Sequence, residues 1–149
     1  MQKVKFLISW ILILSILFCI SIQAGEIRAS GDGTASIIGK GTVEIEAIRA
    51  TLWIWSPDRW LTGNDRGISI DVSGYGTKEE LAPGVYRYKG FDGKATVKGD
   101  VVFGIRVEGK DIKLHGWGDG RIYLEGKGDY WIGGKKFFGW PKGIVIIKP

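Results

Sequence analysis

The stretch Gly118-Asp119-Gly120-Arg121-Ile122-Tyr123-Leu124-Glu125-Gly126-Lys127-Gly128 contains the unit from which most of the chain is built. An Asp-Gly turn signal opens the unit, an alternating segment follows, and a small residue closes it. Successive side chains of a strand point to opposite faces, so Ile122 and Leu124 are predicted to face inward while Glu125 faces water.

The same apolar-x-apolar-x-small pattern occurs nine times, beginning at residues 35, 43, 52, 70, 86, 95, 105, 112 and 122. One solvent-facing side per strand indicates an antiparallel sheet, and no segment from Glu26 onward sustains the helical period. Short strands at such regular intervals are typical of a sandwich or barrel. We therefore predict an all-β domain, an antiparallel sandwich or barrel of about 9–11 short strands, with a β-solenoid as the alternative.

Turn residues divide these predicted strands. The three Asp-Gly pairs at 32–33, 92–93 and 119–120 are predicted to form two-residue hairpin turns, and Pro83-Gly84 suits a type II turn. None of the three copies matches a calcium-binding repeat. Residues 57–67 have the composition of a loop, residues 77–81 are predicted to form a short edge strand, and the apolar run 144–147 is predicted to form a strand covered on both faces.

An export segment precedes the domain. Lys3 and Lys5 come before the uncharged apolar run 6–22, and Ala24 provides a small residue for cleavage. We expect residues 1–24 to be a signal peptide or, if uncleaved, an N-terminal membrane anchor helix, and residues 25–149 to be a single domain that is secreted or held in the cell envelope. Phe18 before Cys19 is too large for a lipoprotein signal.

Composition excludes several classes of function. The chain has 21 basic and 16 acidic residues, and removing Lys3 and Lys5 leaves 19 against 16, so the formal net charge falls from +5 to +3. The basic residues are scattered, which argues against nucleic acid as a partner. The exported part has no Cys, Met or Gln and one Asn, a composition typical of proteins from hot environments.

Groups that could perform catalysis are few. His115 is the one histidine and is expected on an outward strand position, so no metal site or cofactor is predicted. A glycosidase would need two carboxylates that flank the scissile bond, but the spacing of the candidates selects no pair. Those candidates are Glu44, Glu46, Asp71, Glu79, Glu80, Glu108 and Glu125. We therefore expect a protein that is not an enzyme.

The tryptophans allow two interpretations. Trp53 and Trp55 share the strand face opposite Leu52 and Ile54. Either both faces of this strand are covered, with residues 60–61 as part of the cover, or the rings form an exposed aromatic strip that stacks on sugars or contacts a protein or membrane partner. The members of such a ligand-binding strip would be Trp53, Trp55, Trp60, Trp117 and Trp140.

The Asp-Gly copies at 32, 92 and 119, together with Gly-x-Gly segments such as 39–41, 74–76 and 126–128, resemble the glycine-rich strand repeats of exported bacterial and archaeal proteins of unknown function. They are also loosely similar to adhesin head domains, which stack such strands in a solenoid. The resemblance covers most of residues 30–132 and implies no functional residues. The sequence predicts a non-enzymatic structural or interaction module of the cell envelope, with a carbohydrate-binding module as the alternative and a small glycoside hydrolase third. Its partner would be a polysaccharide or another envelope protein, and it would contact a membrane only through residues 1–24.

Overall fold

The computed structural model of the protein describes residues 25–56 and 67–147. These residues form five strands: β1 (Glu26–Trp55), β2 (Ile68–Ala82), β3 (Val85–Ile132), β4 (Lys135–Phe138) and β5 (Gly143–Ile147). The predicted export segment 1–24 and most of the predicted loop, including Trp60, lie outside the described residues. No helix in the described part of the chain is long and apolar enough to cross a membrane.

All five strands belong to one antiparallel sheet with β3 at its centre. β3 pairs with β1 and with β2 along their lengths, and β4 and β5 pair with its last quarter. The predicted all-β, antiparallel character is therefore confirmed. The strands themselves are much longer than predicted, because β1 has 30 residues and β3 has 48.

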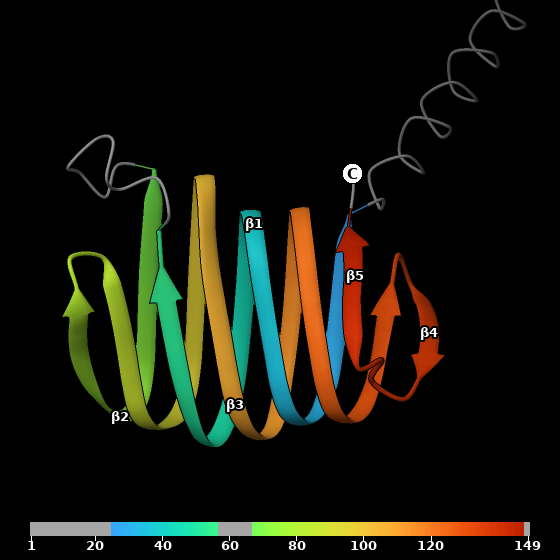
Figure 1. The fold of residues 1–149 in the computed structure, drawn as a ribbon, viewed down its shortest axis with the longest axis horizontal. Helices are drawn as coiled ribbons and strands as arrows, with labels where there is room; N and C mark the ends of the chain where they lie inside the picture. Colours follow the sequence, from blue (N-terminus) through green and yellow to red (C-terminus); the bar gives the residue numbers. More distant parts are fainter. Residues whose placement is uncertain (1–24, 57–66, 148–149) are drawn as a thin grey trace, which may run out of the picture.

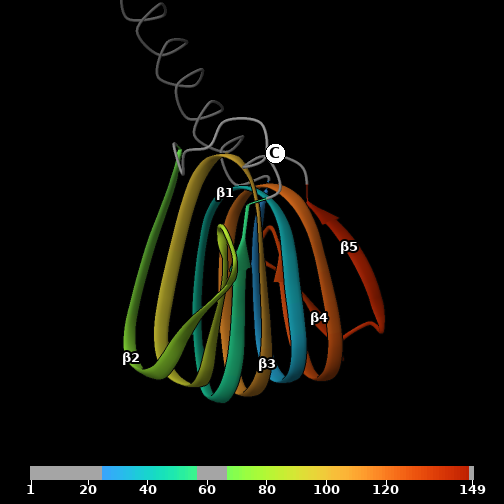
Figure 2. The same ribbon diagram turned by 60° about the vertical axis from the view of Figure 1, so that its left-hand side comes forward.

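Such long strands fit in a small molecule because they wind. Ile37 of β1 pairs with Ile105 on one side and with Ile122 on the other, so β3 returns to the same point of β1 after 17 residues (122 minus 105). Figure 1 shows the two strands as a coiled ribbon whose turns lie side by side, and Figure 2 shows the same coil from another side.

Between its bends the ribbon forms two walls that face each other across the interior. Wall A consists of segments 26–31, 41–47, 68–73, 94–98, 112–117 and 129–132, which are neighbours in the pairing register. Wall B consists of segments 34–38, 51–55, 77–81, 85–89, 104–108 and 121–125, and β5 pairs with its last segment. Each wall has one face toward the interior and one toward solvent.

Paired Gly-x-Gly segments form several of the bends. Gly41 and Gly118 lie opposite each other with φ angles of 135° and 134°, values that L side chains rarely adopt. A Cβ atom on Gly41 would lie only 2.0 Å from the carbonyl oxygen of Trp117. The middle residues of the two segments, Lys40 and Asp119, are also opposite each other and carry opposite charges.

These bends explain why the predicted strand count was wrong. The Asp-Gly pairs at 32–33, 92–93 and 119–120 lie inside β1 and β3 and do not form hairpin turns. Glycine adopts backbone angles that other residues avoid, both at a bend and at a hairpin turn. Here the strand bends and continues into the opposite wall. The apolar-x-apolar-x-small copies are the segments between bends, and in residues 25–56 and 67–147 five strands replace the predicted 9–11.

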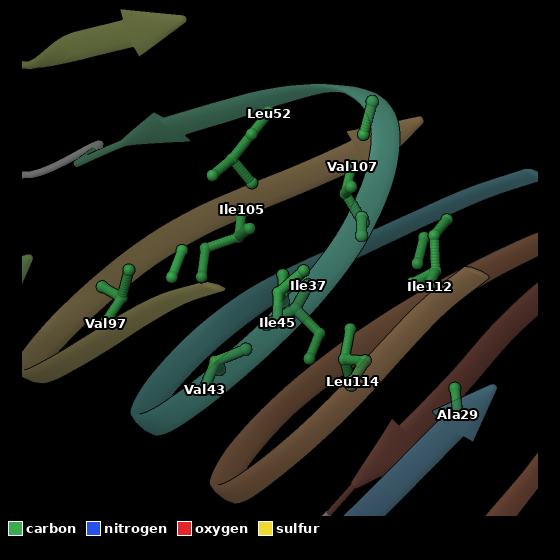
Figure 3. Close-up of a cluster of buried hydrophobic side chains, with 14 of the residues drawn as sticks. Ala29, Ile37, Val43, Ile45, Leu52, Val97, Ile105, Val107, Ile112 and Leu114 are labelled. Atoms are coloured by element: carbon green, nitrogen blue, oxygen red, sulfur yellow. The ribbon is translucent and has the colours of Figure 1, made fainter. Parts of the chain in front are cut away.

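The interior is wholly apolar. In the described residues no polar or charged side chain is buried, and 22 apolar ones form a single cluster. Figure 3 shows side chains from wall A, such as Ile45 and Leu114, pointing toward side chains from wall B, such as Ile37 and Ile105. Ile122 and Leu124 are fully buried, as the alternating pattern predicts.

The two ends of the coil are less well covered. β2 pairs with β3 only, so it is an edge strand, longer than the predicted edge at 77–81, and Ile70 on its inner face is 37% exposed. The predicted turn at Pro83-Gly84 joins β2 to β3, with Gly84 at φ 74°. β5 is an edge strand with Ile144 and Ile146 more than half exposed, so the prediction that both its faces are covered was wrong.

Candidate functional site

A broad groove crosses the outer face of wall A. Its volume is about 640 Å³, within the range of about 300–1,000 Å³ common for small-molecule sites. We call it the polar groove, and the side chains that define it are Glu26, Arg28, Glu44, Glu46, Lys94, Lys113, His115 and Trp131. These residues come from β1 and β3, and only the winding of the two strands brings them together.

The pairing register sets the order of the groove residues. One row runs across four neighbouring segments as Trp131, Arg28, His115 and Glu44. Adjacent strands are about 4.8 Å apart, so three spacings give this row a length of about 14 Å.

A second row lies two residues further along the segments and runs as Ser30, Lys113, Glu46 and Lys94. The two rows are therefore about 7 Å apart. Together they form an elongated floor of polar side chains with Trp131 at one end.

Glu26 connects two side chains at the rim of the groove. Its Oε1 atom lies 2.6 Å from Nε2 of His115 and 3.1 Å from Nε of Arg28. The hydrogen bond with His115 and then that from Arg28 hold the pKa of Glu26 below its ordinary value. The carboxylate thus fixes the positions of an imidazole and a guanidinium that belong to the same row.

Two indole rings lie beside His115 and Arg28. Trp117 is 41% exposed, and its ring centroid lies 3.7 Å from that of His115. Trp131 is half-buried next to Arg28, and Nζ of Lys136 lies 5.5 Å from its ring centroid. The groove therefore has apolar ring surface at its rim and charged groups along its floor.

The formal charges of the groove cancel. Three carboxylates, Glu26, Glu44 and Glu46, stand with three permanent cations, Arg28, Lys94 and Lys113. In the sheet Lys113 lies directly opposite Glu46, which carries the opposite charge. The polar groove thus offers both donors and acceptors without a net field that would select a strongly charged ligand.

The four members of the predicted tryptophan strip that the structure describes do not form one exposed strip. Trp53 and Trp55 lie on the outer face of wall B, opposite the buried Leu52 and Ile54, as their positions predict. Cζ of Arg106 lies 5.8 Å from the ring of Trp53, and the indole of Trp55 covers Gly104, where a Cβ would meet it at 2.1 Å. Both rings are half-buried packing surfaces.

The remaining strip members are separated from this pair. Trp140 is only 8% exposed and its Nε1 donates to the carbonyl oxygen of Asp129, so its assignment to an exposed strip was wrong. Trp117 belongs to wall A beside the polar groove. Trp60 lies outside the described residues.

Trp131, Arg28 and Glu26 were not predicted from the sequence as candidate site residues. Alternation alone predicts that Arg28 and Trp131 point outward from their segments. It does not predict that these two segments are neighbours in the sheet. The pairing of segments about 100 residues apart in the chain supplies that information.

The carboxylates considered for a glycosidase lie on both walls. Glu44 and Glu46 project into the polar groove from one segment, whereas Glu108 and Glu125 belong to wall B. Within residues 25–56 and 67–147 no group of three His, Cys, Asp or Glu residues could hold a metal ion.

Comparisons with protein family models, with curated proteins and with solved structures find no match for this chain. The geometry of the coil and its groove is therefore the basis for a functional proposal.

Proposed function

We propose that the protein is a non-enzymatic interaction module of the cell envelope or the secreted fraction, and that it binds its partner through the polar groove of wall A. The observation that carries this proposal is the distribution of polar groups. The described interior holds no buried polar or charged side chain, while the outer face of wall A gathers charges of both signs around an open hollow. A rigid apolar interior with a patterned outer face suits presentation of a binding surface.

The proposed compartment is supported by the sequence of residues 1–24, with two basic residues before a long apolar run. A β-coil with an uninterrupted apolar interior needs no disulfide, and the exported part contains no cysteine. We further infer that the coil is a form of solenoid rather than a sandwich, because each turn of β3 stacks on β1 and not on a separate sheet.

A hydrolase fits the groove less well. A general acid that works near neutral pH needs a carboxyl group whose pKa is raised by burial or by a like charge. The pKa of Glu26 moves in the opposite direction because His115 and Arg28 favour its charged form. The open groove also leaves its carboxylates in contact with water.

Co-sedimentation with insoluble envelope material from the producing organism tests this function. The wild-type domain, residues 25–149, is expected to sediment with the envelope fraction, and the double variant E46A/K113A is expected to remain in the supernatant. The matched control R106A/E108A removes an exposed ion pair from wall B and should sediment like wild type. Failure of the wild-type domain to sediment, or equal sedimentation of both double variants, would contradict the proposal.

A further inference from the structure

We propose that the polar groove is a binding site for an extended, uncharged polysaccharide, with Trp131 as the ring on which a sugar stacks. This inference rests on the proposed function and names the ligand class of the same site. It moves the site away from Trp53, Trp55 and Trp140, whose rings pack against the protein. Three features of the groove support it.

The first feature is shape. The row Trp131, Arg28, His115 and Glu44 is continuous because it crosses neighbouring strands of one sheet, and its length of about 14 Å gives room for about three pyranose rings. A globular ligand would contact only part of such a surface. An extended chain of β-linked sugars can follow it from strand to strand.

The second feature is the combination of an indole with charged groups on one plane. Sugar rings carry an apolar face of C–H groups and a rim of hydroxyls. A tryptophan ring offers a large, rigid apolar surface for the former. Carboxylates accept and ammonium or guanidinium groups donate hydrogen bonds to the latter, and bonds that involve a charged partner are stronger than neutral ones.

Those polar groups are available in the right places. Glu26 holds Arg28 and His115 in position beside Trp131, which lowers the ordering cost of binding. On the second row, Glu46 and Lys113 face each other across strands, and no described side chain lies within ion-pair distance of either. Their hydrogen-bonding capacity is open to hydroxyl groups of a ligand.

The third feature is charge balance. Three carboxylates and three permanent cations line the groove, so an acidic or a basic polymer would meet as much repulsion as attraction. An uncharged glycan meets neither. This argument separates the proposed ligand from polyuronates, from polyamines and from nucleic acids.

Isothermal titration calorimetry on the domain 25–149 tests the inference with defined probes. The probes are hexasaccharides of β-linked glucose, xylose and N-acetylglucosamine, with polygalacturonate and chitosan as acidic and basic counterparts. At least one uncharged hexasaccharide is expected to bind, and W131A is expected to weaken it about tenfold or more through loss of the stacked ring. W53A, which removes a half-buried indole from wall B, should bind like wild type.

Two further variants keep the test independent of folding. E46Q and K113Q change exposed groups on the groove floor, so circular dichroism and the melting temperature should not change, and each should weaken binding several-fold. If W131A fails to fold, these two variants decide the question.

Several outcomes would overturn the inference. They are wild-type affinity in E46Q, K113Q and folded W131A, preference for the charged polymers, or no binding of any glycan. If no glycan binds while the domain still sediments with envelope material in a groove-dependent manner, the ligand class is wrong and the proposed function stands. If sedimentation is absent as well, both are wrong.

Discussion

The substitution Gly41→Ala should destabilise the protein more than almost any other change of a single methyl group. The new Cβ would lie 2.0 Å from the carbonyl oxygen of Trp117, and the backbone φ of 135° is unfavourable for alanine. Forcing extra volume into a packed site costs about 1–3 kcal/mol. A strained φ costs about the same again. We therefore expect a loss of about 2–6 kcal/mol in the free energy of unfolding, a large part of the roughly 5–15 kcal/mol typical of a domain.

Three other glycines separate the two causes. Gly39 has an ordinary φ, but its Cβ would lie 2.1 Å from the carbonyl oxygen of Asp119, so Gly39→Ala tests the close approach alone. Gly134 has a φ of 83° and no atom within 4 Å of its Cβ position, so Gly134→Ala tests the backbone angle alone. Gly143 has neither feature and serves as the matched control.

Urea denaturation followed by tryptophan fluorescence gives the free energy of unfolding of each variant. We expect the greatest loss for Gly41→Ala, intermediate losses for Gly39→Ala and Gly134→Ala, and no loss or a gain of up to about 1 kcal/mol for Gly143→Ala. Losses for Gly41→Ala and Gly39→Ala within about 0.5 kcal/mol of the Gly143→Ala value would refute the reasoning, because that is the size of ordinary surface effects.

Four further substitutions test other parts of the account. Trp140→Ala should cost about 3–5 kcal/mol because the ring is buried, while Trp117→Ala at an exposed ring should cost less than about 1 kcal/mol, both measured by urea denaturation. Arg49 has a φ of 50°, so Arg49→Gly should raise the melting temperature through relief of about 1 kcal/mol of backbone strain, and a lower melting temperature would contradict this. The lowered pKa of Glu26 stabilises the fold above its unfolded pKa, so Glu26→Gln should be less stable than wild type at neutral pH. This difference in stability should shrink as the pH falls below 4.5 and the carboxylate loses its bond with His115. A difference that is constant down to pH 3 would show that the charged form of Glu26 does not stabilise the fold.

The local part of the fold could be predicted from the sequence because it depends on neighbouring residues. The alternation in segments such as 105–107 and 122–124 identifies side chains that are buried in the coil, since the two-residue period of a strand does not depend on what the strand pairs with. The same period placed Trp53 and Trp55 correctly on the face opposite Leu52 and Ile54. A different inference fails for β5: its continuous apolar run predicted cover on both faces, but Ile144 and Ile146 are exposed on an edge strand.

The winding could not be predicted from such local signals. An Asp-Gly pair relieves the same steric restriction whether the chain reverses in a hairpin or bends and continues. One signal in the sequence does distinguish the two cases: Gly39-Lys40-Gly41 and Gly118-Asp119-Gly120 match as antiparallel partners, with glycine against glycine and a cation against an anion. The segments 31–33 and 126–128, with Asp32 opposite Lys127, match in the same manner.

The site depended on that missing long-range information. Trp131 and Glu44 are outward residues of segments that share no local pattern, and they belong to one row because Arg28 and His115 lie between them in the register. Composition directed attention to the adjacent pair Trp53 and Trp55 instead. Trp53 and Trp55 are close in sequence, and their rings pack against the protein. The polar groove is formed by residues that are far apart in the sequence.

The central claim is that one segment of β1 lies between two successive turns of β3. Nuclear Overhauser effects between side-chain methyl groups test it directly in a sample labelled at isoleucine. We expect Ile37 to show effects to both Ile105 and Ile122, whose positions in β3 are 17 residues apart. Effects from Ile37 to only one of these two residues, together with effects that place residues 35–39 and 43–47 in a local hairpin, would contradict the coiled arrangement.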